Sequence, residues 1–449
     1  MESLRNIKWR GVKLINFLDN TNVDIFDKNI FKMDLPKNVS TILKTLKSNG
    51  YEAYVVGGCV RDAILGVRPS DYDITTSATP TEIKSLFKKT IDTGIKHGTV
   101  SVVFYDDNIP TVYEVTTFRI DGEYEDSRHP KEVTFTTSLI EDLSRRDFTI
   151  NAFAYDESRG LIDEFMGISD LRKKTIRCIG NPVDRFTEDA LRILRSVRFA
   201  AKLGFKIDPS TENAVKILAP TLANISKERV QVEITKTLLS KNPDYIEKVF
   251  ELGLAPYITK DFERIIASDL FVTKNVNIAY ASFLYNNENI AKNVLKDLKL
   301  SNDVIKSVIT MLTSKKYIDV LNRSSDRIDI NAKVIKVSKF QVVVKKLINE
   351  IGFDLAEEFL NLIINKNIDN YNFVYALELL HKYKEDNTPI FIKDLKINGK
   401  DLMDIGFKGE EVGASLNSIL NIIHERPELN ENEILVNISK KVYKKVKKK

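Results

Sequence analysis

Residues 54–62 read Tyr-Val-Val-Gly-Gly-Cys-Val-Arg-Asp, and residues 71–74 read Asp-Tyr-Asp-Ile. The apolar run at the start predicts a β-strand that breaks at the two glycines, and the residues after them predict a short helix. Residues 71–74 predict a second strand. Because side chains alternate along a strand, Asp71 and Asp73 would lie on one face. The stretch therefore predicts a strand, a glycine turn, a helix and a strand that carries two carboxylates.

Both halves of this stretch suit the chemistry of a nucleoside triphosphate. Two carboxylates on one face repel each other unless a cation lies between them, and oxygen ligands of this kind suit Mg²⁺. Gly57 and Gly58 lack side chains, so their backbone N–H groups can approach phosphate oxygens closely. A lone Gly-Gly is usually an ordinary turn, and a lone Asp-x-Asp is usually part of a polar loop. The two together are more specific.

The composition is that of a soluble globular protein. The chain has 449 residues, of which 43% are hydrophobic and 29% charged, and this length indicates about two to four domains. No apolar run approaches the ~20 residues that a membrane span needs, and no secretion signal is evident, so we expect a cytoplasmic location. The two cysteines exclude a disulfide framework and a cysteine zinc site, and the four scattered histidines argue against a histidine metal centre.

The net charge gives no evidence for nucleic-acid binding. The formal value is +5, but residues 440–449 contain seven lysines and no acid, so the rest of the chain is slightly acidic. Binding to RNA would therefore depend on local clusters of basic side chains.

Further elements surround the paired acids. The pattern predicts helices over 39–46 and from Thr79-Pro80, and strands over 52–56, 71–74, 99–105 and 112–116. Glu114, in the last strand, becomes the third acid of one site if that strand neighbours the one with Asp71 and Asp73. Three converging carboxylates are what two-metal nucleotidyl transfer requires. Alternatively, Glu114 is an ordinary solvent-facing acid.

Two further segments allow more than one interpretation. Residues 119–135 are polar, contain a glycine and a proline, and predict a flexible loop. Arg145 and Arg146 are flanked by acids and fit either structural salt bridges or a clamp on a triphosphate, which guanidinium geometry favours.

The character of the chain changes at residues 180–182, Gly-Asn-Pro. Beyond them nearly every segment predicts an amphipathic helix and none a convincing strand, so we place the end of the α+β part near residue 175. A helix is expected to start near Thr187. Three arginines recur along it at intervals of three residues and would fan over one side: Arg192, Arg195 and Arg198.

Asp189 and Arg192 lie one turn apart on this predicted helix. Such a pair is usually an intrahelical salt bridge. The alternative is that the pair recognises the edge of a nucleobase, because Asp accepts a hydrogen bond from an exocyclic amino group and Arg donates one to a ring acceptor. Cytosine and adenine both offer that combination, so the pair would admit CTP and ATP and refuse UTP and GTP. Residues 225–233 are charged and could form ion pairs that brace the arginine helix.

Six motifs, in this order, carry a resemblance to a known family. They are GGCVRD (57–62), DYD (71–73), EVTTFR (114–119), RRDFTINA (145–152), IGNPVDRFTEDALRILRSVRFA (179–200) and ISKERV (225–230). Together they resemble the class II tRNA nucleotidyltransferases, the CCA-adding enzymes, and bacterial poly(A) polymerases share most of them. The resemblance is dense from about residue 37 to 240. It is looser beyond, where INGKDLMDIG (397–406) is similar to the family's tail domain.

The resemblance implies an α+β fold. A nucleotidyltransferase-superfamily mixed β-sheet head with helices would be followed by an all-α neck, body and tail, in a seahorse shape. The implied domains are an N-terminal extension (1–36), the catalytic head (37–175), a neck for base recognition (176–240), and a body (241–340) and tail (341–449) that bind tRNA.

The resemblance also implies roles for the site residues. The catalytic carboxylates would be Asp71 and Asp73, which hold Mg²⁺, and Glu114, which helps to deprotonate the RNA 3′-hydroxyl. The triphosphate would meet Gly58, Arg61 and Arg146. The base would be read by Asp189 and Arg192, in a pocket completed by Arg195 and Arg198.

The implied function is template-independent addition of C, C and A to the 3′ end of tRNA from CTP and ATP, with release of pyrophosphate. The predicted loop at 119–135 disfavours CC-only addition, because CC-adding enzymes lack such a loop. A-adding enzymes and poly(A) polymerases are the alternatives within the family, and a small-molecule nucleotidyltransferase is the alternative from another class. The expected partners are CTP, ATP and tRNA, docked by its acceptor stem and elbow, with no membrane and no protein partner.

Overall fold

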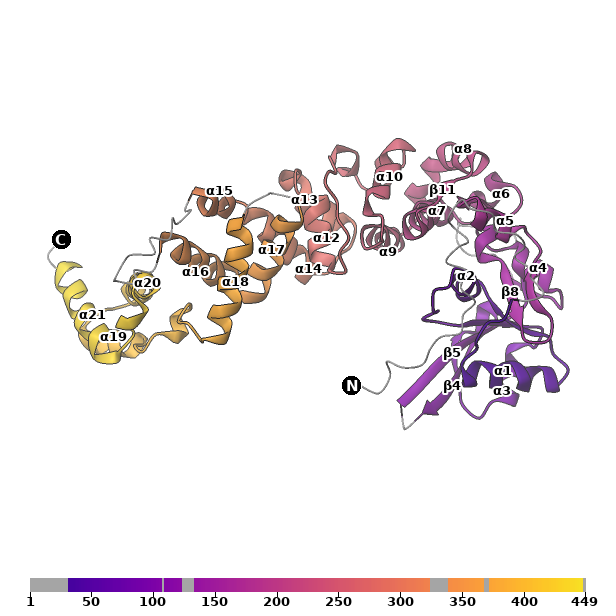
Figure 1. Cartoon of the computed structure of the whole chain (residues 1–449), viewed down its shortest axis with the longest axis horizontal. Helices are drawn as coiled ribbons and strands as arrows, with labels where there is room; N and C mark the ends of the chain where they lie inside the picture. The colour runs from indigo at the N-terminus through magenta and orange to yellow at the C-terminus, as the bar shows by residue number, and fades with distance from the viewer. Residues whose placement is uncertain (1–30, 107–108, 123–132, 324–337, 367–370, 447–449) are drawn as a thin grey trace. The chain divides into compact units, whose positions relative to one another are not determined.

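The computed structural model describes residues 31–106, 109–122, 133–323, 338–366 and 371–446. The chain divides into two compact units, Met1–Glu263 and Arg264–Lys449. The first unit contains a β-sheet and helices, and the second is helical (Figure 1). Among the described residues, no helix combines the length and the apolar character that crossing a membrane requires.

A seven-stranded mixed sheet forms the start of the first unit. In spatial order its strands are β3 (Thr90–Gly94), β4 (Thr99–Asp106), β5 (Ile109–Thr117), β2 (Asp73–Thr76), β1 (Ala53–Val56), β8 (Phe153–Asp156) and β9 (Gly160–Asp163). Neighbouring strands are antiparallel except β2 and β5, which run parallel. The mixed sheet predicted for the head is confirmed, and the strand with Glu114 does neighbour the strand with Asp73.

The turn after β1 decides where the paired acids lie. Strand β1 ends at Val56, which pairs with Asp73 of β2. Gly57 then turns the chain away at a φ of +79°, which L side chains rarely adopt. The strand predicted over 71–74 therefore begins two residues late, at Asp73, because β1 offers no partner beyond Val56. Asp71 precedes the strand, and its carboxylate accepts a hydrogen bond from Ser70 Oγ (2.9 Å).

Five helices pack around the sheet: α1 (Lys37–Ser48), α2 (Gly58–Ile64), α3 (Pro80–Leu86), α4 (Leu139–Ser144) and α5 (Gly167–Arg172). Helices α1 and α3 lie side by side, and α2 lies between the sheet and the later helices of the unit (Figure 1). As predicted, α3 starts at Thr79-Pro80, where Thr79 and Glu82 cap it reciprocally. One core cluster consists of Tyr54, Val56, Phe118, Leu139, Leu143, Ala152, Ala154 and Ile179.

The last part of the N-terminal extension predicted over residues 1–36 packs on this sheet, and the structure describes it from residue 31. Phe31 and Met33 are buried, and the rings of Phe31 and Tyr155 meet edge to face with centroids 5.6 Å apart. The end of the extension therefore contributes apolar contacts to the head.

Helices make up most of the rest of the first unit: α6 (Pro182–Glu188), α7 (Leu191–Leu203), α8 (Pro209–Leu218), α9 (Lys227–Leu238), α10 (Glu247–Glu251) and α11 (Ala255–Ile258). The prediction of one helix from near Thr187 is wrong, because α6 ends and α7 begins on either side of Asp189. Asn181 caps α6, accepting from Val183 N (3.0 Å), so the Gly-Asn-Pro stretch starts a helix. The Asp189 carboxylate accepts from Leu191 N (3.0 Å) in the break.

Two short strand pairs depart from the sequence-based expectations. β10 (Thr175–Ile176) and β11 (Lys206–Ile207) pair in parallel, although no strand was expected beyond residue 180. β6 (Arg119–Asp121) and β7 (Val133–Phe135) pair antiparallel. The ends of the predicted loop are therefore strands, and its middle, residues 123–132, lies outside the described residues.

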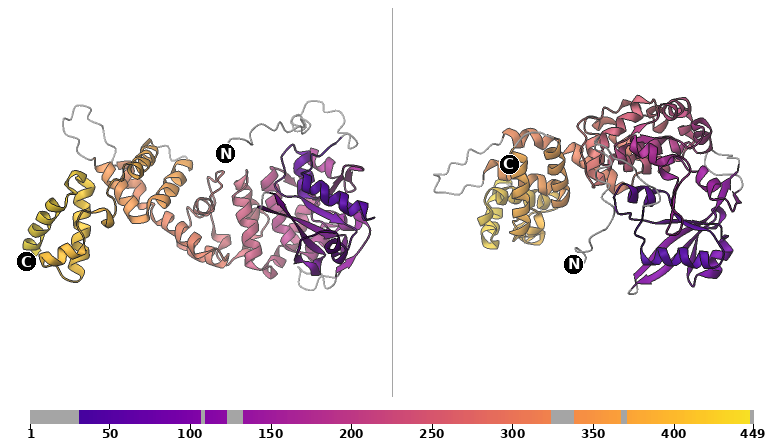
Figure 2. Two further views of the ribbon diagram at one scale, coloured as in Figure 1. Left: turned by 90° about the horizontal axis from the view of Figure 1, so that it is seen from below. Right: turned by 45° about the vertical axis from the view of Figure 1, so that its right-hand side comes forward.

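The second unit consists of helices and connecting segments in the part of it that the structure describes (Figure 2). Its helices are α12 (Val276–Phe283), α13 (Glu288–Asp297), α14 (Asn302–Thr313), α15 (Lys316–Arg323), α16 (Lys339–Ile351), α17 (Phe353–Asn365), α18 (Tyr371–Glu385), α19 (Gly399–Ile405), α20 (Glu410–Glu425) and α21 (Asn432–Val446). The compact units meet at residues 263 and 264, inside the predicted body domain. The five predicted domains and their boundaries stay predictions.

Candidate active site

A cavity of about 580 Å³ opens in the first unit, where the β1–α2 turn, the start of β2, the segment after α4, and helices α7 and α9 meet. Nine of the ten site residues predicted from the sequence line it: Gly58, Arg61, Asp71, Asp73, Arg146, Asp189, Arg192, Arg195 and Arg198. The tenth, Glu114, does not. Residues more than 130 positions apart in the chain therefore meet in one site.

The paired acids lie at one side of the cavity. Burial raises the pKa of the Asp73 carboxyl above its ordinary value, and the nearby Asp71 carboxylate adds to this shift, while Arg146 opposes it. Two acids that repel each other beside a cavity fit a divalent cation, which would relieve the repulsion through its own charge. Among the described residues, no cluster of three or more Asp, Glu, His or Cys side chains has the arrangement of a metal site.

Glu114 lies close to these acids in the sheet and outside the cavity. Ile74 pairs with Val115 in the parallel ladder, so Glu114 is beside Asp73, and neighbours in register share a face. The Glu114 side chain is exposed. Asp73 and Glu114 are therefore neighbours in the sheet, Asp71 lies just before β2, and the three acids form no compact cluster among the described residues.

The two glycines have different roles in the turn. Gly57 has a positive φ, which strains any other residue, and a Cβ there would lie 2.9 Å from Nη1 of Arg146, so the end of that side chain would have to shift. Gly58 starts α2, and its Cβ would meet Arg61 only at 3.5 Å, an ordinary contact. In the free protein, only Gly57 is required by the backbone.

Replacing each glycine by alanine separates an effect on the stability of the fold from an effect on nucleotide binding. We expect Gly57→Ala to lower the free energy of unfolding by about 1–3 kcal/mol because of the φ strain and the contact with Arg146. Gly58→Ala should leave it nearly unchanged and raise KM for CTP about tenfold, if the Gly58 backbone approaches the phosphates. Urea unfolding and initial rates measure the two effects. A KM within twofold of the parent value would contradict the role of Gly58.

Arg61 belongs to a chain of hydrogen bonds that crosses the cavity wall. The side chain is 2% exposed and donates to Asp62 Oδ1 (2.6 and 2.8 Å) and to Asn151 Oδ1 (2.5 Å). Asn151 donates in turn to Asp147 Oδ1 (3.0 Å), and Asp147 Oδ2 accepts two bonds from Arg195 (2.6 and 2.8 Å). Helices α2 and α7 are therefore joined through the side chains of Asn151 and Asp147, from the segment after α4.

Both interpretations of the arginine pair after α4 find support. Asp142 is fully buried and forms ion pairs with Arg145 (2.7 Å) and Arg146 (3.6 Å), as the salt-bridge interpretation predicts. Arg146 nevertheless lines the cavity, and its buried Nε has no hydrogen-bond partner among the described residues. A guanidinium held by one long ion pair can still bind a phosphate oxygen.

The stability of the head should depend on Asp142 ionisation. Burial alone would raise the pKa of Asp142, but Arg145 and Arg146 outweigh it and hold the pKa below its usual value. A lowered folded-state pKa stabilises the fold above the unfolded-state pKa of about 3.9, and this contribution is lost as pH falls through the folded-state value. We expect Asp142→Asn to cost about 3 kcal/mol at pH 7, with the difference shrinking below about pH 4.

Urea unfolding of the parent chain and of Asp142→Asn at pH values from 7 to about 3 measures how their difference in stability depends on pH. Glu141→Gln is the matched control, because Glu141 is the exposed neighbour of Asp142. A difference between Asp142→Asn and the parent chain that stays constant down to about pH 3 would contradict the assigned linkage.

On the helical side, each predicted base reader has a partner from another segment. Asp189 forms an ion pair with Arg229 of α9 (2.8 Å), and Arg198 forms one with the buried Glu233 of α9 (2.5 Å). The expectation that residues 225–233 brace the arginine helix is confirmed. Arg192 forms an ion pair with Glu188 (2.5 Å), four residues before it, so the neighbouring acid Glu188 is a salt-bridge partner of this arginine.

Seven residues that line the cavity were not predicted as site residues from the sequence: Asp147, Asn151, Leu191, Phe199, Lys202, Arg229 and Lys236. All but Lys202 and Lys236 lie in the quoted motifs, so the motifs marked the region without indicating which side chains face the cavity. In all, nine Lys or Arg and four Asp side chains line the cavity. This excess of positive charge fits a polyanionic ligand such as a triphosphate.

Two family models match the chain: the poly A polymerase head domain over residues 53–177, and the probable RNA- and SrmB-binding site of polymerase A over residues 204–266. The CCA-adding enzyme of Ligilactobacillus salivarius is 37% identical over 417 residues, which cover 92% of this chain and 96% of that protein. The chain belongs to the family of CCA-adding enzymes. It is a tRNA nucleotidyltransferase, and enzymes of this kind depend on a metal ion.

Other members of the CCA-adding family agree along the whole chain. The Pediococcus pentosaceus enzyme is 35% identical over 420 residues, which cover 91% of this chain and 98% of that protein. The crystal structure of the Bacillus stearothermophilus CCA-adding enzyme in complex with CTP has a TM-score of 0.77 and 31% identity, covering 93% of this chain and all of that one. The Thermotoga maritima CCA-adding enzyme complexed with tRNA shares the fold, with a TM-score of 0.60, 21% identity and coverage of 92% and 97%.

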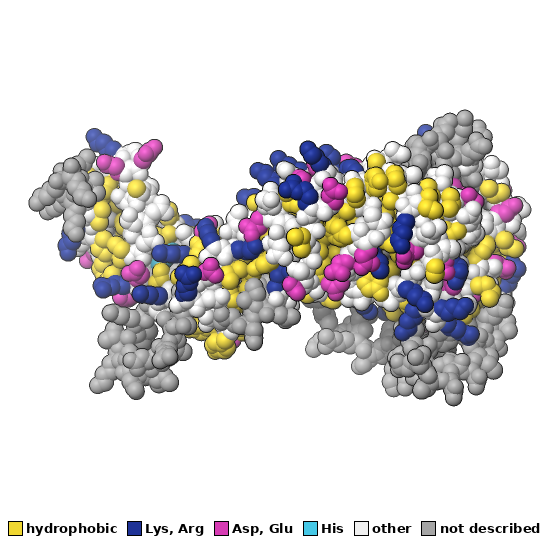
Figure 3. All heavy atoms as spheres, turned by 90° about the horizontal axis from the view of Figure 1, so that it is seen from above, with side chains coloured by type: hydrophobic (Ala, Val, Ile, Leu, Met, Phe, Trp, Pro, Cys, Tyr) yellow, Lys and Arg dark blue, Asp and Glu magenta, His cyan; other side chains and the backbone are white. Residues whose placement is uncertain are grey.

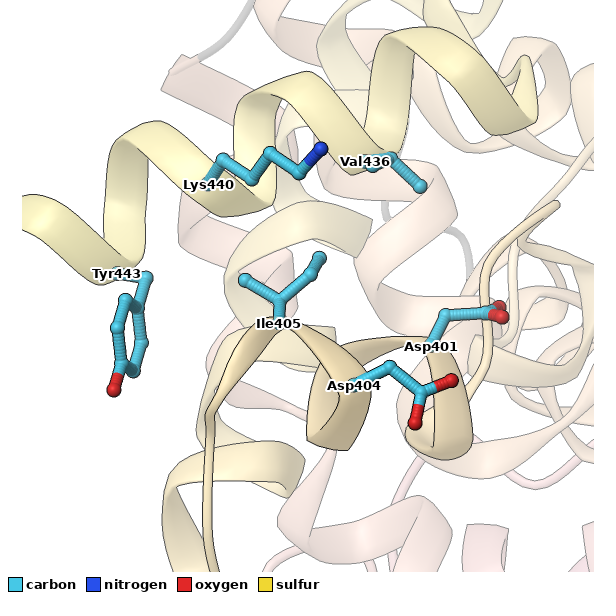
Figure 4. Close-up of a pocket in the computed structure, with 6 residues that line it drawn as sticks. All are labelled: Asp401, Asp404, Ile405, Val436, Lys440 and Tyr443. Carbon is cyan, nitrogen blue, oxygen red and sulfur yellow. The ribbon is translucent and has the colours of Figure 1, made fainter.

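The tail of this CCA-adding family member has a second cavity, of about 520 Å³, between α19 and α21 (Figure 4). It is lined by Asp401, Asp404, Ile405, Val436, Lys440 and Tyr443, none of which is a predicted site residue. Asp401, Asp404 and Ile405 belong to the INGKDLMDIG stretch, so this resemblance coincides with a hollow in the tail. On the face in Figure 3, Lys and Arg side chains gather in several clusters.

Proposed function

We propose that this chain adds C, C and A in succession to the 3′ end of tRNA, without a template, from CTP and ATP, and releases pyrophosphate. The observation that carries the proposal is the single cavity in which carboxylates, phosphate-binding candidates and base-reading candidates meet. The family membership supports the same activity, because its named members are CCA-adding enzymes.

In this proposal Asp71 and Asp73 hold the metal, and Mg²⁺ is the ion that hard carboxylate oxygens suit best. Bound there, Mg²⁺ would offset the charge that develops on the phosphates during transfer. Gly58, Arg61 and Arg146 bind the triphosphate. Arg146 is the cation with the unpartnered Nε, while Arg61, held by Asp62 and Asn151, acts as a fixed part of the wall.

The proposed reaction is a displacement at the α-phosphorus. The 3′-oxygen of the RNA forms a bond to that phosphorus, and the bond to the bridging oxygen of the β-phosphate breaks, so pyrophosphate leaves. Glu114, beside Asp73 in the sheet, would take the proton of the 3′-hydroxyl. Holding both reactants in line accounts for much of the rate.

The base is selected by Asp189 and Arg192, with Arg195 and Arg198 completing the pocket. Asp189 accepts from the amino group of cytosine or adenine, and Arg192 donates to the neighbouring ring acceptor. Their partners Arg229 and Glu188 support this proposal, because side chains held in place lose less freedom when the base binds.

The tRNA is proposed to dock through its acceptor stem and elbow on the body and tail, by shape and phosphate contacts, as A-form RNA favours. The basic clusters on the face in Figure 3 support this. Because tRNA is the substrate, we also propose a cytoplasmic location. A-only addition and poly(A) synthesis are the alternatives within the family.

Nucleotide incorporation into a tRNA transcript that ends at its discriminator base tests the proposal. We expect two C residues and one A, then arrest, with UTP and GTP refused and with activity lost on chelation and restored by Mg²⁺. Incorporation of A alone only on tRNA that already ends in CC would favour an A-adding enzyme. Unlimited A addition to arbitrary RNA would favour a poly(A) polymerase. No incorporation into any RNA would overturn the nucleotidyl-transfer proposal.

A further inference from the structure

The ring of Phe199 is surrounded by three guanidinium groups in the wall of the cavity. The guanidinium carbon of Arg198 lies 4.0 Å from the ring centroid, and those of Arg61 and Arg195 each lie 5.3 Å from it. The side chain lines the cavity and is 6% exposed. All three distances are within the ~6 Å over which an aromatic face attracts a cation.

Helix geometry and the head both contribute to this cluster. Arg195 is one turn before Phe199 on α7, and Arg198 is its immediate neighbour, so both come from the same helix. Arg61 comes from α2, at the glycine turn. The ring of Phe148 meets Phe199 edge to face, with centroids 5.7 Å apart, and limits the movement of the ring.

Each guanidinium also has an acidic partner, and the three partners lie on different segments. Arg61 contacts Asp62 in α2, Arg195 contacts Asp147 after α4, and Arg198 contacts Glu233 in α9. These ion pairs fix one side of each group and pull the three in different directions. Phe199 is the side chain that all three have in common, and the negative face of its ring attracts cations that would otherwise repel one another.

We propose that Phe199 is a positioning residue of the nucleotide site, and that its π-electrons hold Arg61, Arg195 and Arg198 together in the arrangement that binds CTP and ATP. The ring links the proposed triphosphate side of the cavity, through Arg61, to the proposed base side, through the two arginines of α7. This inference rests on the proposed function for the identity of the ligand.

A fluorinated series at position 199 tests the electronic role at nearly constant shape. Phenylalanine is replaced in the full-length chain by its mono-, di-, tri- and pentafluoro analogues, which weaken and finally reverse the attraction of the ring face for cations. CTP affinity is measured by titration without tRNA. We expect the dissociation constant to rise stepwise with each fluorine, to about tenfold for the pentafluoro ring, while the thermal midpoint changes little.

The same series at Phe186 is the matched control. Phe186 is fully buried in α6, does not line the cavity, and has no cation over its ring among the described residues. Fluorination there should leave CTP affinity unchanged. Phe199→Tyr keeps the ring and should retain affinity, whereas Phe199→Leu should lose it to the same extent as the pentafluoro ring.

A CTP dissociation constant that stays within twofold across the series at position 199 would overturn the proposal and leave Phe199 a packing residue. Equal effects at positions 199 and 186 would overturn it too. This experiment measures CTP binding, so its result is separate from that of the incorporation assay. If the parent chain binds CTP but adds no nucleotide to tRNA, the proposed function is contradicted. The fluorinated series still tests the role of Phe199 in that case.

Discussion

Addition of both C and A should fall by about a thousandfold or more when Asp73 is replaced by asparagine. The substitution keeps the shape of the side chain and removes one of the two charges that we propose to hold the metal, a loss of on the order of 4 kcal/mol in transition-state stabilisation. Single-turnover rates of CTP and ATP incorporation at saturating Mg²⁺ measure this. The affinity for tRNA, measured by filter binding, should stay within about twofold of the parent value.

The stability of this variant is part of the prediction. Because burial and Asp71 raise the pKa of Asp73, its charged form is disfavoured in the folded protein, and removing the charge should leave the thermal midpoint unchanged or slightly higher. Asp92→Asn is the matched control, an exposed aspartate on the same sheet paired with Lys84 (3.0 Å) away from the cavity. An Asp73→Asn variant that retains a tenth of the parent rate would rule out the proposed role of Asp73 in holding the metal.

Asp189→Asn should change which nucleotides are accepted. Asn can still accept the hydrogen bond from Leu191 N, but it carries no charge for Arg229, and its amide N–H can donate to the O4 of uracil. We expect the preference for CTP over UTP, as a ratio of kcat/KM values, to fall by about 1–3 kcal/mol, or about five- to 150-fold. Competition between labelled CTP and UTP at the first position of addition gives this ratio directly.

Asp208→Asn is the control for the loss of stability that Asp189→Asn could cause. Asp208 also accepts backbone N–H groups at a helix start, from Ser210 (3.1 Å), and also pairs with an arginine, Arg177 (2.9 Å), but it does not line the cavity. If both variants lose stability and neither alters the CTP/UTP ratio, Asp189 is a helix cap with an ion pair and reads no base.

The sequence predicts which residues belong to the site better than it predicts where the backbone places them. The resemblance to a known family, carried by six ordered motifs, selects nine residues that share one cavity, whereas residue type and spacing alone left salt bridges as alternatives for several of them. The details of the backbone depend on partners that are distant in the chain. Asp71 lies before its predicted strand because β1 ends at Val56, and Asp189 lies in the break between two helices, where its carboxylate accepts a hydrogen bond from Leu191 N.

The missed residues have a common physical reason. Asp147 and Asn151 look like ordinary polar residues of a motif until Arg61 and Arg195 approach them from other segments. Phe199 has the spacing of a core aromatic, and only the tertiary fold brings Arg61 of another helix over its ring. Contacts of this kind depend on the packing of elements far apart in sequence, which helical or strand periodicity does not encode.

Every side chain that lines the main cavity belongs to the compact unit that ends at Glu263. In the proposed function, side chains of the first unit therefore supply the metal-holding, phosphate-binding and base-reading groups that line this cavity. Selection pressure on the two units should differ accordingly. Substitutions in the second unit would change which RNA molecules are served and how long they stay, and could accumulate without altering the order in which C and A are added.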